Sequence, residues 1–221
     1  MSLPSSLLSV DQWNSLKTLV RKEMNASPAS HGWDHVKRVL ELSLKIGKKE
    51  KADLSILSLA ALLHDIGRKD EYASKGKICH AHVGALKAEQ LLAPYDLPQG
   101  ITQELKYCIQ SHRFRGKKPP GSLEAKVLFD ADKLDSIGAV GVGRAFLFAG
   151  EVGARLHNPH KDLSMTVSYS REDTAYREFT VKLIKVKDRL LTPTGKAIAE
   201  SRHRFMVRFF KRLDDEVKGI K

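Results

Sequence analysis

The chain has 221 residues and a formal net charge of +12, from 38 Lys and Arg against 26 Asp and Glu. No stretch reaches the roughly 18 uninterrupted apolar residues of a membrane span, and the first residues lack the basic start and long apolar run of a signal peptide. The two cysteines make neither a CxxC pair nor a disulfide framework. We therefore expect a cytoplasmic protein with one substantial core and no membrane partner.

The basic surplus is spread along the chain, and basic residues alternate with acidic ones in its charged segments. Aromatic residues make up only 7% of the chain, so few side chains are available to stack on bases. This distribution predicts a solvated surface that attracts anionic small molecules. Nucleic acid is not expected to be the physiological partner.

Apolar residues recur every three or four positions through most of the chain, which is the spacing of one helix face. Residues 153–170 lose this periodicity and collect Gly, His, Asn, Pro and Ser, so we expect a mobile loop or lid there. For residues 125–129 a buried strand is the alternative to a helix, because that apolar run is short. The pattern predicts an all-α protein. Its helices are expected at about residues 9–25, 33–47, 53–67, 81–92, 99–112, 123–134, 171–190 and 194–217.

The helix expected at residues 53–67 is apolar on every face from Leu57 to Leu63, and the pair His64 and Asp65 occupies its final turn. A helix that is apolar all round is normally buried. The two polar side chains therefore emerge inside the core, where unpaired polar groups are costly. This pattern predicts that they meet partners there.

Two such partners are expected on other helices. His35 shares the inward apolar stripe of the helix at 33–47, and Asp132 is predicted to face inward from the helix at 123–134. With His64 and Asp65 they make two imidazoles and two carboxylates, which suit Mn²⁺, Fe²⁺, Co²⁺ or Zn²⁺ and, less well, Mg²⁺. Such an ion lowers the pKa of bound water from about 15.7 toward about 7, so hydrolysis is the expected chemistry.

Three segments of the chain resemble the HD-domain metal-dependent phosphohydrolases: HGWDHVKR at 31–38, LHDIG at 63–67 and FDADKLD at 129–135. The resemblance covers about residues 28–150 and is closest to small stand-alone members with a glycine-rich stretch after the last aspartate. It implies a helical bundle in which a central apolar helix carries the His-Asp pair. The chain would then be a single HD-type domain over 1–221, with helices at about 171–217 packed on the core. The implied metal ligands are His35, His64, Asp65 and Asp132.

Two further histidines, His80 and His112, lie between the His-Asp pair and the last aspartate. In related proteins with two or three metals, extra histidine ligands come from this interval. They fit either a second metal or a phosphate group. A single metal with both histidines as phosphate contacts is the preferred interpretation, because no acidic bridging ligand is evident after the third helix.

Cations near the metal would neutralise charge that develops on a phosphoryl group. Arg68 directly follows the metal pair and Lys133 directly follows Asp132, so these two rank first. Together with Asp65, His80 and His112 they are the predicted catalytic residues. The full set of candidate cations is Arg68, Lys69, Lys77, Arg113, Arg115 and Lys133.

Residues that flank the ligands are candidates for supporting roles. His31 lies one helical turn before His35 and is interpreted as a residue that contacts a ligand or the substrate. One carboxylate among Asp34, Asp130 and Asp135 would orient a ligand imidazole or act as a general base, although Asp135 is better explained as an exposed carboxylate or helix cap. The glycine-rich stretch at 138–143 lacks the features of a Rossmann or P-loop motif and predicts close helix packing.

The expected function is hydrolysis of a nucleotide or similar phosphate ester by attack of water on phosphorus, with nucleotide pyrophosphohydrolysis as one form of it. Two alternatives stay open. A minority of HD proteins with two irons oxidise their substrates with O₂, which requires a bimetallic ligand set. The other alternative is a regulatory module that binds nucleotides or nucleic acid, with a nuclease included in that class.

Overall fold

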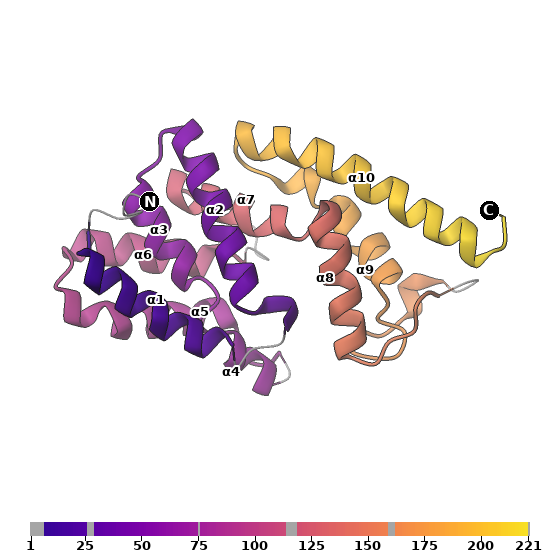
Figure 1. Cartoon of the computed structure of the whole chain (residues 1–221), viewed down its shortest axis with the longest axis horizontal. Helices are drawn as coiled ribbons and strands as arrows, with labels where there is room; N and C mark the ends of the chain where they lie inside the picture. Colours follow the sequence, from indigo (N-terminus) through magenta and orange to yellow (C-terminus); the bar gives the residue numbers. More distant parts are fainter. Residues whose placement is uncertain (1–6, 26–28, 75, 114–118, 159–161, 221) are drawn as a thin grey trace. The chain divides into compact units, whose positions relative to one another are not determined.

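The computed structural model describes residues 7–25, 29–74, 76–113, 119–158 and 162–220, and these contain helices but no strand. The predicted all-α class is therefore confirmed, and the alternative of a strand at 125–129 is wrong because those residues are helical. The α-helices are α1 Val10–Met24, α2 Trp33–Glu50, α3 Leu54–Leu63, α4 Arg68–Ala73, α5 His80–Leu92, α6 Gln99–Ser111, α7 Leu123–Asp135, α8 Gly138–Glu151, α9 Ala175–Val181 and α10 Pro193–Val217 (Figure 1).

Several helices begin where capping residues predict. The Ser9 side chain accepts a hydrogen bond from the Gln12 backbone, and Asp53 caps α3 in the same way. The predicted end of α2 at Gly47 is wrong, because the helix continues to Glu50. Gly47 instead makes room for α3: a Cβ atom at this position would overlap Leu57.

The helix expected at 53–67 is shorter than predicted. It ends at Leu63, residues 64–67 form a turn, and α4 begins at Arg68. The turn is closed by hydrogen bonds from the Ile66 amide to the Leu63 carbonyl at 3.1 Å and from the Arg68 amide to the Asp65 carbonyl at 2.9 Å. His64 and Asp65 therefore belong to a tight turn after the apolar helix, and not to its final turn.

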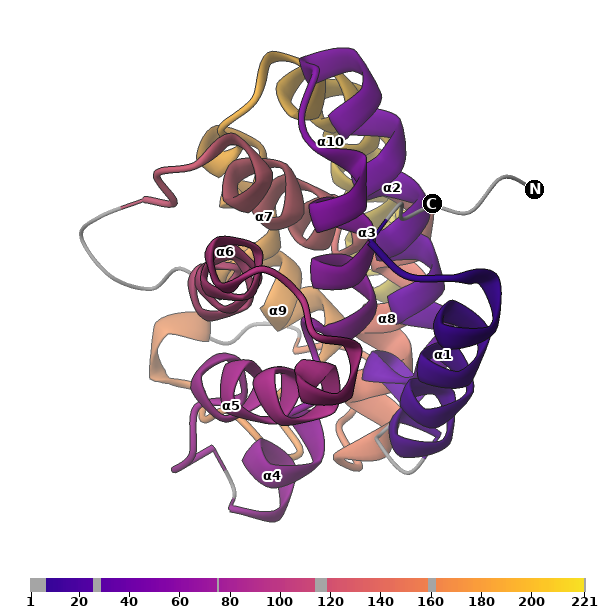
Figure 2. The same cartoon turned by 90° about the vertical axis from the view of Figure 1, so that its left-hand side faces the viewer.

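The chain divides into two compact units, residues 1–132 and 133–221. In the first unit, α3 packs against α1 and α2 and also against α6, while α5 packs against α6 and α4 (Figure 2). Residues 56–63 of α3 are buried on every face, as its composition predicts. The apolar helix is thus the centre of the first unit. The expectation of one domain over 1–221 stays a prediction.

The second unit is built from α8, α9 and α10, with α8 packed against both others. The glycines of the stretch at 138–143 start α8, and a Cβ atom at Gly141 would lie 2.9 Å from Met206 Cε of α10. The predicted close packing is confirmed. The predicted helix at 171–190 is wrong, since α9 ends at Val181 and two short 3₁₀ helices follow. Leu183 and Val186 are both buried there, and their three-residue spacing matches a 3₁₀ turn.

The irregular segment expected at 153–170 lies in the second unit, although residues 159–161 are outside the described residues. The described part contains one 3₁₀ helix, Leu163–Met165, and is tied to the start of α9. Arg177 donates to Asp173 at 2.7 Å and to the Thr166 carbonyl at 3.1 Å, and Asn158 donates to the Glu172 carbonyl at 3.0 Å. Its predicted role as a mobile lid stays a prediction.

Helices able to cross a membrane are absent from the described residues, because none is both long enough and apolar enough.

Candidate metal centre

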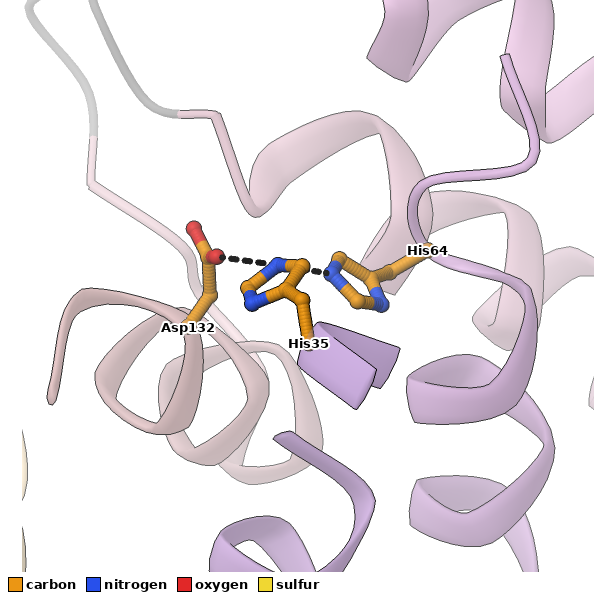
Figure 3. Close-up of side chains that lie close together, drawn as sticks. All are labelled: His35, His64 and Asp132. Atoms are coloured by element: carbon orange, nitrogen blue, oxygen red, sulfur yellow. Dashed lines mark hydrogen bonds and ion pairs between the residues drawn. The ribbon is translucent and has the colours of Figure 1, made fainter. Parts of the chain in front are cut away.

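His64 and Asp65 are fully buried in the turn after α3, and two predicted ligands from other helices reach them. His35 of α2 places its Nε2 atom 3.2 Å from His64 Nε2 and 3.4 Å from Asp132 Oδ1 of α7 (Figure 3). The ligand atoms of His35, His64 and Asp132 all lie within 4.8 Å of one another. The structure thus brings together the side chains that the sequence predicts as ligands.

A second group lies beside the first. The ligand atoms of Asp65, His80 and His112 also lie within 4.8 Å of one another, and all three residues are buried. Asp65 Oδ1 is 3.4 Å from the Nε2 atoms of both His80 and His112, while Asp65 Oδ2 is 3.4 Å from His35 Nε2. One carboxylate therefore faces both groups. The preference for a single metal depended on the lack of a bridging acid, and the structure supplies one in Asp65.

The position of His80 depends on a backbone contact between the turn and α5. A Cβ atom at Gly67 would overlap the His80 carbonyl oxygen and lie 2.8 Å from the Gly84 amide nitrogen. Only glycine therefore allows the first turn of α5 to approach the His-Asp turn this closely. This approach brings His80 to the buried Asp65 carboxylate.

The hydrogen bonds of the imidazoles show which ring nitrogens carry protons. His64 Nδ1 lies 2.8 Å from the Ala61 carbonyl oxygen, and His112 Nδ1 lies 2.6 Å from the Ile109 carbonyl oxygen. Carbonyl oxygens only accept, so each Nδ1 donates and each Nε2 keeps its lone pair. His80 Nδ1 similarly faces the Glu71 carboxylate at 2.7 Å. Three Nε2 lone pairs consequently point toward the Asp65 carboxylate.

Around Asp65 Oδ1, the described residues supply no hydrogen-bond donor, and the arrangement there fits a cation. Burial lowers the pKa of His64 to about 3 and that of His80 to about 4, so both are neutral at pH 7. With Nδ1 as the donor atom in both rings, the Nε2 atoms of His80 and His112 face each other at 3.1 Å as two acceptors. Asp65 Oδ1 is buried and accepts no hydrogen bond from the described part of the chain. A divalent metal would satisfy these acceptors, and the donor set fits such an ion.

Sequence reasoning missed Glu71, a buried residue in the first turn of α4. Arg68 donates through Nε to Asp65 Oδ2 at 2.9 Å and through Nη1 to Glu71 Oε2 at 2.8 Å, and Arg113 Nη2 lies 2.6 Å from Glu71 Oε1. Burial opposes ionisation of Glu71, but the His80 hydrogen bond and the nearby cations lower its pKa to about 2. The available signal was the opposite charge three residues after Arg68, a spacing that pairs side chains on a helix.

The other predicted cations lie in different surroundings. Arg68 is paired with two carboxylates and is not ordinary surface charge, while Lys69 and Lys77 are exposed. Lys133 is half-buried in α7, directly after Asp132, and its contact with a phosphate group stays a prediction. Arg115 is outside the described residues.

The residues that flank the ligands in sequence differ in burial and in their contacts. The His31 ring lies edge-on to His35, with ring centroids 5.9 Å apart, so it is placed to support that ligand. Asp34 is exposed and pairs with Lys37 at 2.6 Å, while Asp130 is fully buried. Asp135 was expected to be exposed or a cap, and that is wrong: it is buried and pairs with Arg144 at 3.0 Å.

The buried neutral histidines predict acid sensitivity of the metal-free protein. The pKa values of His64 and His80 lie below their ordinary value of 6.5 in the folded state. The unfolded chain therefore binds more protons below about pH 6.5, and stability falls as the pH falls. We expect a loss of roughly 1 kcal/mol per pH unit for each histidine, down to about pH 4 for His80 and pH 3 for His64.

Urea unfolding with a chelator present at pH 7.0, 6.0 and 5.0 measures this effect. Glu71 adds to the loss only below its ordinary pKa of 4.5, so this window excludes it. Burial also lowers the pKa of His157 in the second unit, so His157→Gln is the background in which His64 and His80 are measured. A free energy of unfolding that stays constant or increases from pH 7 to pH 5 would contradict the neutral-imidazole assignment.

Comparison with known proteins identifies the family of this helical protein with its buried His-Asp centre. A family model described as HD domain matches residues 32–137. YpgQ of Bacillus subtilis (strain 168) is 36% identical over 219 residues, which cover 95% of each chain. The chain belongs to the HD-domain superfamily of metal-dependent hydrolases.

Solved structures of related proteins share the fold across nearly the whole chain. The crystal structure of Bacillus subtilis YpgQ in complex with ADP matches with 31% identity and a TM-score of 0.71, covering 94% of this chain and 95% of that one. An HD-superfamily hydrolase from Bacillus thuringiensis matches with 26% identity and a TM-score of 0.71, covering 94% and 97%. The predicted HD-type fold is confirmed.

Proposed function

We propose that the protein is a metal-dependent phosphohydrolase that acts on a nucleotide or a similar phosphate ester. The observation that carries this proposal is the buried centre in which His80 Nε2 and His112 Nε2 converge on Asp65 Oδ1, an atom that accepts no hydrogen bond from the described residues. His35, His64 and Asp132 would hold one divalent ion, His80 and His112 a second, and Asp65 would contact both. Such ions supply water of lowered pKa and positive charge for a phosphoryl oxygen.

The remaining residues of the centre position these ligands. Arg68 holds Asp65 through its Nε atom and leaves the other carboxylate oxygen, Oδ1, directed at His80 and His112. Among the named side chains, the carboxylates of Asp65, Glu71 and Asp132 outnumber the guanidinium groups of Arg68 and Arg113 by one. These five side chains alone therefore give the centre a negative charge. We infer that phosphate binding depends on bound metal.

A nucleotide is the favoured substrate class for two reasons. The related YpgQ was solved in complex with ADP, which supports a site for a nucleoside phosphate in the same fold. The net charge of +12 also favours approach of a multiply charged anion over a neutral one. Separate measurement of phosphate and pyrophosphate distinguishes the two modes of hydrolysis.

The second ligand group also keeps the oxygenase alternative open. A di-iron oxygenase needs two metal sites, and the structure offers ligands for two. Counting bound metal therefore cannot separate the two reactions. Dependence on O₂ does separate them, because hydrolysis consumes water and no oxidant.

The test is a panel of nucleoside mono-, di- and triphosphates with Mn²⁺, Fe²⁺, Co²⁺ or Mg²⁺, with phosphate and pyrophosphate measured separately. A labelled oligonucleotide belongs in the same panel. We expect turnover of at least one mononucleotide with a transition metal, at equal rates with and without O₂. The variant His64→Gln is the control for contaminating phosphatases. Faster cleavage of the oligonucleotide, or a strict need for O₂, would exclude the proposed reaction class.

A further inference from the structure

The Glu71 carboxylate joins three parts of the first unit. It lies on α4, accepts from His80 Nδ1 at the start of α5 at 2.7 Å, and contacts Arg113, just after α6, at 2.6 Å. It also accepts from Arg68 on its own helix at 2.8 Å. Three donors thus converge on one buried carboxylate, and each donor belongs to a residue beside the metal centre.

The imidazole of His80 is oriented by a different kind of hydrogen-bond partner from those of the ligand histidines His64 and His112. His64 and His112 donate through Nδ1 to backbone carbonyls three residues earlier, so their orientation is set by their own segments. His80 donates to a side chain. A carboxylate accepts only, which keeps the proton on Nδ1 and the lone pair on Nε2, toward Asp65. We propose that Glu71 is a positioning residue that makes His80 a metal ligand and thereby completes the second ligand group.

Replacement of Glu71 by glutamine should reverse this arrangement. The amide keeps the shape of the side chain but offers one acceptor oxygen to three donors. Arg113 contacts Oε1, while Arg68 and His80 share Oε2, and Arg68 has a second partner in Asp65. The charged guanidinium of Arg113 therefore keeps the amide oxygen, and the amide nitrogen takes the place of Oε2. The amide nitrogen then donates to His80 Nδ1, and the imidazole proton moves to Nε2. From there it faces Asp65 Oδ1, which lacks a hydrogen bond in the described structure, so His80 no longer offers a lone pair to a metal.

A matched control lies on the same helix. Asp70 precedes Glu71, and its Oδ2 atom accepts from Lys87 Nζ of α5 at 2.5 Å. It therefore links the same two helices as Glu71 does through His80, but at a partly exposed position and through Lys87, which belongs to neither ligand group. The variant Asp70→Asn removes a carboxylate from the α4–α5 contact without a change at His80. It separates a general loss of helix packing from a specific loss of the ligand.

The first measurement is equilibrium binding of MnCl₂ to metal-free wild type, Glu71→Gln and Asp70→Asn. This inference rests on the proposed two-metal centre, so wild type is expected to bind two equivalents. Glu71→Gln should weaken one equivalent by about 10- to 100-fold, the usual effect of losing such a supporting partner, and leave the other unchanged. Asp70→Asn should match wild type.

If wild type binds no Mn²⁺, the proposed function itself fails. If wild type binds only one equivalent, or if Glu71→Gln binds both as wild type does, the role of Glu71 is refuted.

The second measurement tests the proposal on the wild-type protein, so its outcome does not depend on whether a Glu71 variant folds. Nitrogen-15 NMR of the metal-free wild type distinguishes the two imidazole tautomers, and the His80 signals are assigned by their absence in His80→Gln. We expect the proton of His80 on Nδ1 in wild type and on Nε2 in Glu71→Gln. A wild-type His80 with its proton on Nε2 would overturn the inference whatever the metal content or activity of the enzyme.

Discussion

Replacement of Asp65 by asparagine is expected to remove most bound metal and all measurable hydrolysis while the protein stays folded. The Asp65 carboxylate faces both ligand groups, with Oδ1 at 3.4 Å from His80 and Oδ2 at 3.4 Å from His35. The asparagine amide keeps its shape but loses its charge. Loss of a partner outside the ligand set commonly costs 10- to 100-fold in metal affinity, so loss of this ligand should cost more than about 100-fold.

The folded state should tolerate this change. The amide nitrogen gives the centre a donor for the acceptor atoms that face Asp65, so the metal-free variant has no new unpaired group. Metal analysis of the purified protein, turnover and far-UV circular dichroism measure the three effects. Asp34→Asn is the control, because Asp34 adjoins the ligand His35 in sequence but is exposed. A variant at Asp65 with wild-type metal content and rate would show that the metal centre is assigned wrongly.

The second large effect is expected in the core of the second unit. Phe210 of α10 is fully buried, and its ring stacks on Phe179 with centroids 4.4 Å apart and planes 13° apart. Phe210→Ala removes this ring and leaves a cavity among neighbouring aromatic side chains. Such a truncation costs about 3–5 kcal/mol of unfolding free energy.

Phe205 provides the comparison on the same helix. Its side chain is 40% exposed, so Phe205→Ala should cost well under half as much. Urea titrations followed by circular dichroism give both values under the same conditions. Equal losses for the two variants would mean that the packing of α10 against α9 differs from that described.

The first ligand group, together with Asp65, could be predicted from sequence because two independent constraints coincide. The residues from Leu57 to Leu63 must be buried, which places His64 and Asp65 in the core, and the periodicity of the neighbouring helices directs His35 and Asp132 inward. Buried polar side chains need polar partners, so these four side chains are expected to contact one another. The resemblance to HD proteins identifies the same residues.

The second group could not be predicted in the same way. It depends on the turn at 64–67, which aims the second oxygen of Asp65 away from the first group, and on the short helix α4, which carries Glu71. The segment from Leu57 to Leu63 is apolar on every face, so it gives no signal that marks the end of α3 at Leu63. The short α9 was missed for a related reason, since buried residues at 183 and 186 fit a long helix and successive tight turns about equally well.

The contact at Gly67 bears on how such centres are recognised in other chains. A search by side chains looks for the histidines and aspartates, but here one of the histidines arrives only because two stretches of backbone touch. A sequence with the same ligands but with valine in place of Gly67 would be found by such a search. Its α5 would have to lie farther from the His-Asp turn, because the valine side chain would overlap the His80 backbone. We therefore expect that the number of ions a relative can hold depends partly on whether glycine occupies this position.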